Sequence, residues 1–303
     1  MEKILIIVGI ILCVVASMVI VFTRRPKFGR APTDGRMERI QSSSHYMNGK
    51  FQCLEPVGKI LEGSQAGVLW NFLFGSKQNL VPHEIMPSKK IDLKTLDIDQ
   101  NIVVWLGHSS FYMQIDKKRI LIDPVFSNYA SPLFFINKAF AGSNIYTAED
   151  IPEIDVLIIS HDHWDHLDYP TIMALKLKIK EIICPLGVGE YFEEWGFSAE
   201  KLHEDDWFTQ AKLAENFSIY ILPAQHFSGR FLKKNPTQWA GFAFVTPECR
   251  VFYSGDTGYG KHFKTIGEMF GGFDLAIMEN DQYNKAWPRI HMMPEEQCGQ
   301  LLM

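Results

Sequence analysis

The chain has 303 residues, 47% of them hydrophobic and 21% charged, which is typical of a globular protein with a hydrophobic core. Its length allows one large domain or two ordinary ones. The net charge of −5 argues against a general nucleic-acid binder, because such proteins normally carry a basic balance or a basic stripe.

The cysteines predict neither a disulfide framework nor a thiolate zinc site. They are odd in number, widely spaced and without a C-x-x-C pair. A reducing compartment is the simplest interpretation. The cysteines are Cys13, Cys53, Cys184, Cys249 and Cys298.

The N-terminal segment is predicted to be a transmembrane anchor over residues 1–23. From Ile4 to Phe22 it is uncharged and almost wholly apolar, and a helix of this length spans roughly 28 Å, close to the ~30 Å hydrocarbon core of a bilayer. A cleaved signal peptide is the alternative, but the apolar run is longer than a usual h-region and no A-x-A site follows it. The basic residues after the helix predict a cytoplasmic body. These are Arg24, Arg25, Lys27 and Arg30.

Residues 24–98 are predicted to be a tether and an N-terminal extension. Residues 24–50 are polar and basic with few apolar anchors, so we expect a tether there. The apolar cluster GVLWNFLFG, at 67–75, predicts either a short helix packed on the main domain or an interfacial helix lying on the bilayer.

Residues 99–303 are predicted to form the main domain, because short β-rich runs alternate there with turn residues and helical patterns. Helical patterns occur at roughly 171–180 and 187–195. Many buried strands with interspersed helices predict a layered α/β sandwich. The predicted strands are 102–107, 111–115, 119–123, 156–160, 181–184, 217–222, 241–245, 250–255 and 273–278.

The stretch SHDHWDHLD, residues 160–168, concentrates imidazole and carboxylate groups at one point of the chain. These are the usual ligands of a borderline divalent metal such as zinc. The stretch begins at the carboxyl end of the apolar run VLIIS, where a loop can aim side chains into a cleft. His161 and His163 can face one ion, and Asp165 and His166 can face another.

Two further candidate ligands follow later strands. FSIYILPAQ is followed by His226, and RVFYSG is followed by Asp256. Alone, His226 is explained equally well as an exposed or internally hydrogen-bonded histidine, and Asp256 as a turn or helix-cap aspartate. Their order and their strand-end placement after the His-rich stretch favour a shared metal site.

This series of motifs resembles the metallo-β-lactamase fold. More narrowly it resembles the branch that contains N-acyl-phosphatidylethanolamine-hydrolysing phospholipase D, and it is also similar to ascorbate-6-phosphate lactonase. The resemblance covers about residues 100–297 and implies an αββα sandwich with the metals at one edge. The motifs are WLGHSS (105–110), LIDPVFSNYASP (121–132), ISHDHWDHLD (159–168), AQHF (224–227), SGDTGY (254–259), FDLAI (273–277) and HMMPEE (291–296).

The resemblance implies two zinc ions. His161, His163 and His226 would hold the first, Asp165 and His166 the second, and Asp256 would bridge both. The family also has a last strand and helix with one more histidine ligand, which have no counterpart before Met303. We therefore expect the second zinc site to be incomplete in this chain.

The resemblance also suggests roles for residues around the metals. Asp123 matches an aspartate that orients the metal loop, although an ordinary Asp-Pro turn explains it equally well. His108 is similar in position to a family histidine of the same second shell. His291 matches a pocket histidine that is a proton donor or a substrate contact, and we take Asp165 and His291 as the candidate catalytic residues.

Zinc lowers the pKa of bound water to about 7, so the family chemistry is hydrolysis. We expect phosphodiester hydrolysis of an N-acyl-phosphatidylethanolamine-type lipid. The alternatives are a lactonase acting on a phosphorylated sugar lactone and an inactive, truncated metal-binding relative. The expected partners are a membrane lipid, the membrane itself and, as an open option, a second copy in a homodimer, but no nucleic acid. The run SPLFFINKAF (131–140) would line an acyl channel, touch the bilayer or belong to the core.

Overall fold

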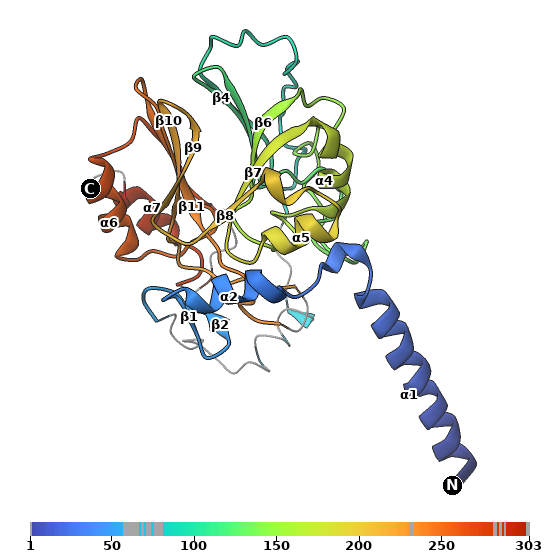
Figure 1. Ribbon diagram of the computed structural model, residues 1–303. Helices are drawn as coiled ribbons and strands as arrows, with labels where there is room; N and C mark the ends of the chain where they lie inside the picture. Colours follow the sequence, from blue (N-terminus) through green and yellow to red (C-terminus); the bar gives the residue numbers. More distant parts are fainter. Residues whose placement is uncertain are drawn as a thin grey trace.

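The computed structural model of the chain describes residues 2–56, 67, 70, 74–75, 81–230, 233–280, 284, 287 and 289–300. Two β-sheets face each other, and helices cover their outer faces (Figure 1). The cluster predicted at 67–75 lies mostly outside the described residues. The layered α/β sandwich that the sequence predicts is confirmed, and both of its sheets are mixed.

The first sheet combines antiparallel and parallel pairing. Its strands are β3 (Ile102–Gly107), β4 (Ser110–Ile115), β5 (Lys118–Ile122), β6 (Ile154–Ile158), β7 (Ile179–Pro185) and β8 (Leu202–Asp205). They lie side by side in this order. The pairs β3–β4 and β4–β5 are antiparallel, and the pairs from β5 to β8 are parallel. The ends of β3, β5, β6 and β7 therefore meet at one edge of the sheet.

The second sheet is antiparallel except at one side. Its strands are β9 (Thr209–Ala214), β10 (Phe217–Leu222), β11 (Gly241–Val245), β12 (Arg250–Tyr253) and β13 (Leu275–Ile277). They also lie in sequence order, and only β12 and β13 run parallel. The predicted strands 217–222 and 241–245 are confirmed as β10 and β11. A small hairpin, β1 (Tyr46–Met47) with β2 (Lys50–Phe51), lies outside both sheets.

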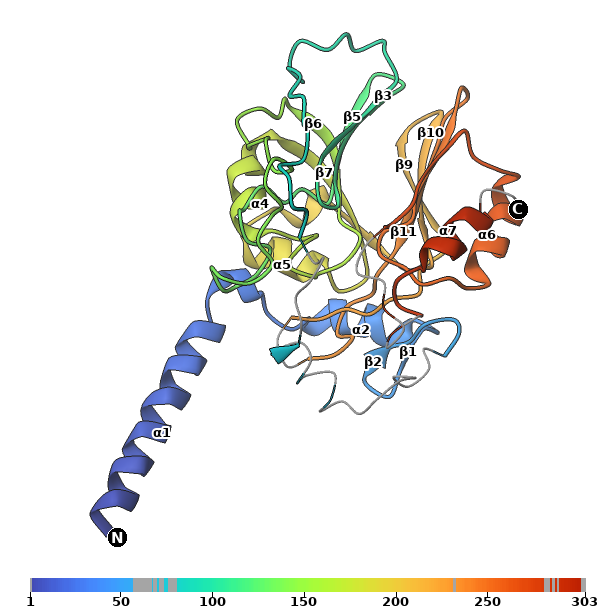
Figure 2. The same cartoon turned by 180° about the vertical axis from the view of Figure 1, so that it is seen from behind.

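Helices complete the layers. In the two opposite views, α4 and α5 cover the first sheet, and α6 and α7 lie beyond the second (Figures 1 and 2). The helix predicted at 171–180 is shorter than expected, because β7 already begins at Ile179. The helical segments are α1 (Glu2–Thr23), η1 (Pro26–Phe28), α2 (Asp34–Ser42), α4 (Tyr169–Leu175), η2 (Lys176–Lys178), α5 (Gly189–Glu194), η3 (Ala199–Lys201), α6 (His262–Phe270) and α7 (Pro294–Gln300).

Alternation along the strands sends apolar side chains into separate layers. Val156 and Ile158 of β6 join the cluster between the two sheets, whereas Leu157 points to the cluster beneath α4 and α5. In β11, Phe244 faces the central cluster and Ala243 faces the cluster beneath α6. A strand with both faces covered needs apolar residues on both, which explains the continuous hydrophobic runs in the sequence.

The segment expected to be a tether is folded onto the domain. Residues 24–50 include η1, α2 and β1 rather than a free chain. Ile40 of α2 and Phe51 of β2 are fully buried in the central cluster. The few apolar residues of this polar segment thus act as anchors, because each is placed against the open end of the sandwich.

Buried charges hold α2 against α5 and strand β8 of the first sheet. The Arg36 guanidinium lies 2.6 Å from a carboxylate oxygen of Glu190, 2.7 Å from one of Glu204 and 2.9 Å from one of Glu193. Its pKa is raised because these carboxylates outweigh the burial that acts against the charge. Glu190 and Glu204 are themselves buried, and Arg36 is the one buried cation among the three arginines that contact them, since Arg30 and Arg39 are half-exposed.

We expect Arg36→Ala to lower the free energy of unfolding by about 3–5 kcal/mol, because the buried carboxylates of Glu190 and Glu204 then keep only the half-exposed Arg30 and Arg39 as cations. Denaturant titration of the detergent-solubilised protein measures this change. The matched control is Lys180→Ala, which removes an exposed pair with Asp155 and should cost about 1 kcal/mol or less. Equal effects of the two variants would contradict the structural role of Arg36.

Candidate metal centre

The His-rich loop leaves the end of β6 and closes into a tight turn. The amides of His166 and Leu167 both donate to the carbonyl of His163, at 3.2 and 2.9 Å. The turn brings the rings of His161 and His166 to a centroid distance of 4.1 Å. Candidate ligands five residues apart in sequence are thereby brought together at one edge of the sheet.

One group of candidate ligands combines both sheets. His161 Nε2 and His163 Nδ1 lie 2.8 Å apart, and His226 Nε2 lies 3.3 Å from the same His163 nitrogen. Asp256, just after β12, places Oδ2 3.6 Å from His226 Nε2. One donor atom from each of these four residues falls within 4.8 Å of the others.

A second group lies directly beside the first. It consists of His108, Asp165 and His166, again with donor atoms within 4.8 Å of one another. His108 Nε2 is 3.1 Å from Asp165 Oδ2, and His166 Nε2 is 3.2 Å from Asp256 Oδ1. Asp256 thus directs one carboxylate oxygen to each group. This is where a bridging ligand would lie, and the bridging role stays a prediction.

Glycine is required where the chain reaches Asp256. Gly255 has a φ of +57°, and a Cβ on it would lie 2.6 Å from the carbonyl oxygen of Ala240. A side chain would therefore force this backbone away from the neighbouring strand β11 and move Asp256 with it.

Asp123 contacts His166 of the second group on the side of the ring that faces away from Asp256. Its Oδ2 accepts from His166 Nδ1 at 2.8 Å and from the Tyr253 hydroxyl at 2.7 Å, and its Oδ1 accepts from the Ser160 amide at 2.8 Å. The bond to Nδ1 leaves His166 Nε2 pointing toward Asp256. The contacts exceed those of an ordinary Asp-Pro turn, although the role itself remains a prediction.

His226 is oriented in the same way by a backbone group. Its Nδ1–H donates to the carbonyl of Ile290 at 2.9 Å, so Nε2 carries the free lone pair that faces His163. Ile290 precedes His291, and the two imidazole rings of His226 and His291 lie 4.9 Å apart. The segment before α7 therefore contributes to the position of a ligand on the loop after β10.

The electrostatics of the site suit a cation. Burial lowers the pKa of His161 and His226 well below the usual value, so both are neutral and offer lone pairs. Burial also lowers the pKa of His166, but Asp256 and Asp123 outweigh it and raise this pKa well above its usual value. The two carboxylates thus favour a positive charge at His166, which a proton or a metal ion would supply.

One buried atom supports the fit of a metal ion. His166 Nε2 is buried and has no hydrogen-bond partner, although its distance to Asp256 is short. A buried ring nitrogen left in this way costs free energy unless something binds it. Imidazole nitrogens and carboxylate oxygens are the donors that zinc and similar divalent ions prefer, so the residues present fit such an ion.

His291 lies at the rim of the first group. Its Nδ1 is 3.0 Å from Glu279 Oε2, and Glu279 Oε1 accepts from the amide of Met292. Burial raises the pKa of Glu279, and its contact with His291 acts in the opposite direction. The structure thus places His291 within reach of the site, and its proposed proton transfer is untested.

Several contributors have no signal in the sequence. The hydroxyl of Tyr253 reaches Asp123 from the other sheet, and Ser160 Oγ lies 3.0 Å from His161 Nδ1. Arg230 is buried against the His-rich loop of residues 160–168, here called the metal loop. Its Nε donates there to the carbonyl of Asp162 at 2.6 Å. The contacts of Tyr253 and Arg230 join segments that are distant in sequence, and that of Ser160 depends on the conformation of the loop, so residue type alone does not reveal them.

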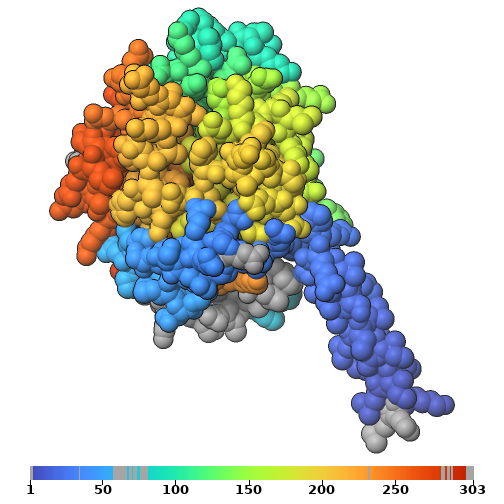
Figure 3. Space-filling model, viewed as in Figure 1, coloured from blue at the N-terminus to red at the C-terminus, as the bar shows by residue number. Residues whose placement is uncertain are grey.

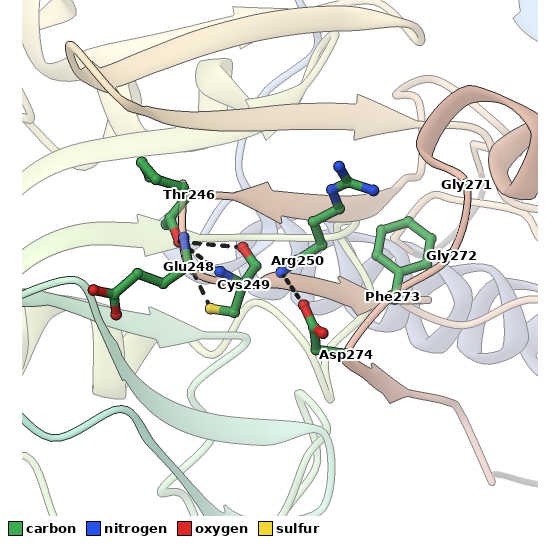
Figure 4. Close-up of a pocket in the computed structure, with 9 residues that line it drawn as sticks. Thr246, Glu248, Cys249, Arg250, Gly271, Gly272, Phe273 and Asp274 are labelled. Carbon is green, nitrogen blue, oxygen red and sulfur yellow. Dashed lines mark hydrogen bonds between the residues drawn. The ribbon is translucent and has the colours of Figure 1, made fainter.

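A surface pocket of about 400 Å³ lies away from these ligands. It is formed by the turn between β11 and β12 together with the loop before β13, and Asp274 Oδ2 there accepts from the amide of Arg250 at 2.7 Å (Figure 4). Arg250 begins β12, whereas Asp256 follows its end. The pocket and the metal-ligand groups therefore lie at opposite ends of the strand.

A family model described as the beta-lactamase superfamily domain matches residues 118–302. An uncharacterized protein of Mycobacterium tuberculosis is 36% identical over 258 residues, which cover 84% of this chain and 69% of that protein. The N-acyl-phosphatidylethanolamine-hydrolyzing phospholipase D 1 of Caenorhabditis elegans is 30% identical over 296 residues, covering 85% of this chain and 81% of the relative.

Among solved structures, a metallo hydrolase from the archaeon Ignicoccus hospitalis superposes with a TM-score of 0.50 at 21% identity. The superposition covers 65% of this chain and 76% of that one. At this level of identity the likeness concerns the fold alone.

We expect Asp123→Asn to weaken metal binding about ten- to a hundredfold, because His166 loses the partner that orients its ring. Competition with a chelating indicator measures the affinity. The control is Asp168→Asn, which removes another buried carboxylate of the same loop that instead accepts from Ser127 Oγ at 2.7 Å. Unchanged affinity in Asp123→Asn would contradict the orienting role.

Proposed function

We propose that this chain, which belongs to the beta-lactamase superfamily, is a metal-dependent hydrolase. Its proposed substrates are N-acyl-phosphatidylethanolamine-type lipids, in which it would cleave a phosphodiester bond. The observation that carries the proposal is the pair of adjacent ligand groups that share Asp256. Hydrolases that use paired metal ions polarise the substrate and activate water at such a site.

The residues would divide the work as follows. His161, His163 and His226 would hold one divalent ion, and Asp165 with His166 a second, with Asp256 between them. Ions bound there would neutralise charge on a phosphoryl group and lower the pKa of water. We leave the identity of the metal open.

His108 supplements the second group in this proposal. Its Nε2 lies 3.1 Å from Asp165 Oδ2, so it is close enough to bind the same ion directly rather than only to orient a ligand. Burial raises the pKa of Asp165, but the hydrogen bond from His108 and the charge of His166 outweigh it and leave this pKa below its usual value. Asp165 is thereby held as a carboxylate, the form in which it is a ligand.

His291 is the group best placed to exchange a proton with the leaving alcohol. Its Nδ1 faces the buried Glu279 carboxylate, which fixes the ring and directs the opposite nitrogen away from that carboxylate. Cleavage of the lipid at phosphorus would release an N-acylethanolamine and leave phosphatidate.

A lipid substrate is favoured by two features. The relative from Caenorhabditis elegans bears the name of this activity and aligns with most of the chain. In addition, α1 is a helix long and apolar enough to cross a membrane, with exposed side chains along its length (Figure 3). We propose that α1 is a retained anchor with the body on the cytoplasmic side, because basic residues follow it.

The substrate is tested by incubating the detergent-solubilised full-length chain with N-acyl-phosphatidylethanolamine and measuring N-acylethanolamine by mass spectrometry. We expect turnover, loss to background in His161→Ala, and full activity in the surface variant Leu177→Ala. Opening of a phosphorylated sugar lactone without lipid cleavage would replace the lipid by the lactone. Lipid turnover that survives in His161→Ala would contradict the metal mechanism.

The anchor is tested in membranes isolated from expressing bacterial cells. We expect the chain to stay in the membrane through alkaline carbonate washing and to keep its original N-terminus, because a 22-residue apolar helix remains in the bilayer. N-terminal sequencing distinguishes this from a signal peptide. A new N-terminus after α1, or release by carbonate, would refute the anchor.

A further inference from the structure

The segment that follows α1 is held against the main domain by buried contacts. Trp195 Nε1 donates to the carbonyl of Pro26 at 2.8 Å. The ring of Phe28 is buried, and its centroid lies 5.0 Å from that of Trp164 in the metal loop. The chain therefore leaves α1 at a defined point beside the loop that carries the candidate ligands.

Arg230 joins this exit point to both ends of the metal loop. Its buried guanidinium donates to the carbonyls of Lys27, Asp162 and Leu167. It also lies 4.2 Å from the centroid of the Trp164 ring, a distance suited to a cation–π contact. Because one planar group holds three backbone segments, the end of α1 and the metal loop form one unit.

Exposed apolar side chains gather next to this unit. The loop of residues 131–142, here called the aromatic loop, carries Phe134 and Phe135, which are 79% and 64% exposed with their rings 5.2 Å apart. Large aromatic side chains in water are costly unless a partner covers them. The loop lies beside the top of α1 in both ribbon views, and Lys27 Nζ donates to the carbonyl of Pro132 at 2.7 Å (Figures 1 and 2).

A neighbouring segment enlarges the patch. The amide of Met86 donates to the carbonyl of Ala141 at 2.8 Å, which fastens residues 81–88 to the aromatic loop. Ile85, 73% exposed, extends the apolar surface there. The loop also returns against the end of β3, where a Cβ on Gly107 would lie 2.7 Å from the carbonyl oxygen of Ser143. The patch is therefore at the same edge of the sandwich as the metal ligands.

We propose that the aromatic loop and Ile85 insert into the surface of the bilayer that holds α1. The edge of the sandwich that carries the candidate metal ligands, here called the metal edge, would then face the lipid. The occupant is an anionic phospholipid bilayer rather than a protein, because the patch is continuous with α1 and basic side chains cluster at their junction. These are Arg24, Arg25 and Lys27. This inference rests on the membrane anchoring proposed above.

Docking of this surface on the bilayer would give a lipid substrate direct access to the candidate metal ligands. A lipid headgroup that lies at the bilayer surface would reach the metal edge without leaving the membrane. The rigid junction through Arg230 would hold the distance between the bilayer and the ligands constant, which a flexible tether would not do. Phenylalanine side chains on the apolar face of an interfacial segment are buried at the boundary between headgroups and acyl chains, which is the level at which the loop would sit.

The test is photo-crosslinking of the full-length chain in bilayers of phosphatidylcholine and phosphatidylglycerol. Benzoylphenylalanine at position 134 replaces one aromatic ring by another. The same residue at position 14 of α1 reports whether the helix is in the membrane. Position 177 is the matched control, because Leu177 is 97% exposed but precedes β7 at the opposite end of the sheet.

We expect lipid adducts by mass spectrometry at positions 14 and 134 in comparable yield, and none at 177. Adducts at 14 without adducts at 134 would overturn the docking surface while leaving the anchor intact. No adduct at 14 would refute the proposed anchoring, and the docking surface with it. Equal yields at 134 and 177, or a protein adduct at 134 in native membranes, would also overturn the inference.

Discussion

The carboxylate of Asp123 connects the ends of three strands from both sheets. It follows β5, accepts from Ser160 and His166 after β6, and accepts from Tyr253 at the end of β12. Asp123 is fully buried and has a φ of +42°, a conformation that a non-glycine residue adopts only when its surroundings stabilise it. The surrounding hydrogen bonds supply that stabilisation. They also fix the positions of the two sheets and the metal loop relative to one another.

The candidate metal centre depends on these fixed positions. Neutral imidazoles of His161, His163 and His226 converge from two sheets, and the Asp256 carboxylate lies between them and His166. Such a concentration of lone pairs and negative charge in a buried place is unfavourable by itself. A bound cation would remove this cost, and the unpartnered Nε2 of His166 marks one point where it would bind.

In the proposed membrane arrangement, the N-terminal segment determines how the molecule meets the bilayer. Buried contacts of Ile40 and Phe51, the ion pairs of Arg36 and the hydrogen bonds of Arg230 fix this segment to the sandwich. A hydrophobic helix followed by such a rigid junction does more than concentrate a domain near the bilayer. In the proposed arrangement it would also set which edge of the domain faces the lipid, namely the edge that carries the candidate ligands.

The sequence by itself determined the features that depend on local patterns. The apolar runs of β10 and β11, the length and polarity of α1, and the His-rich loop after β6 are all readable from residue type and spacing, because burial and strand geometry impose them locally. The strand-end positions of His226 and Asp256 followed from the same patterns. By contrast, β8 and β9 have mixed polar sequences, and α6 was not apparent, so none of these stood out.

Only the tertiary structure decided which distant residues meet. The contacts of Tyr253 with Asp123, of Ile290 with His226 and of Arg230 with the metal loop link segments from different elements. It also showed that residues 24–50 are part of the folded body, because their few apolar side chains fill one end of the sandwich. Sequence patterns report what a residue can do, whereas packing selects the partner with which it does so.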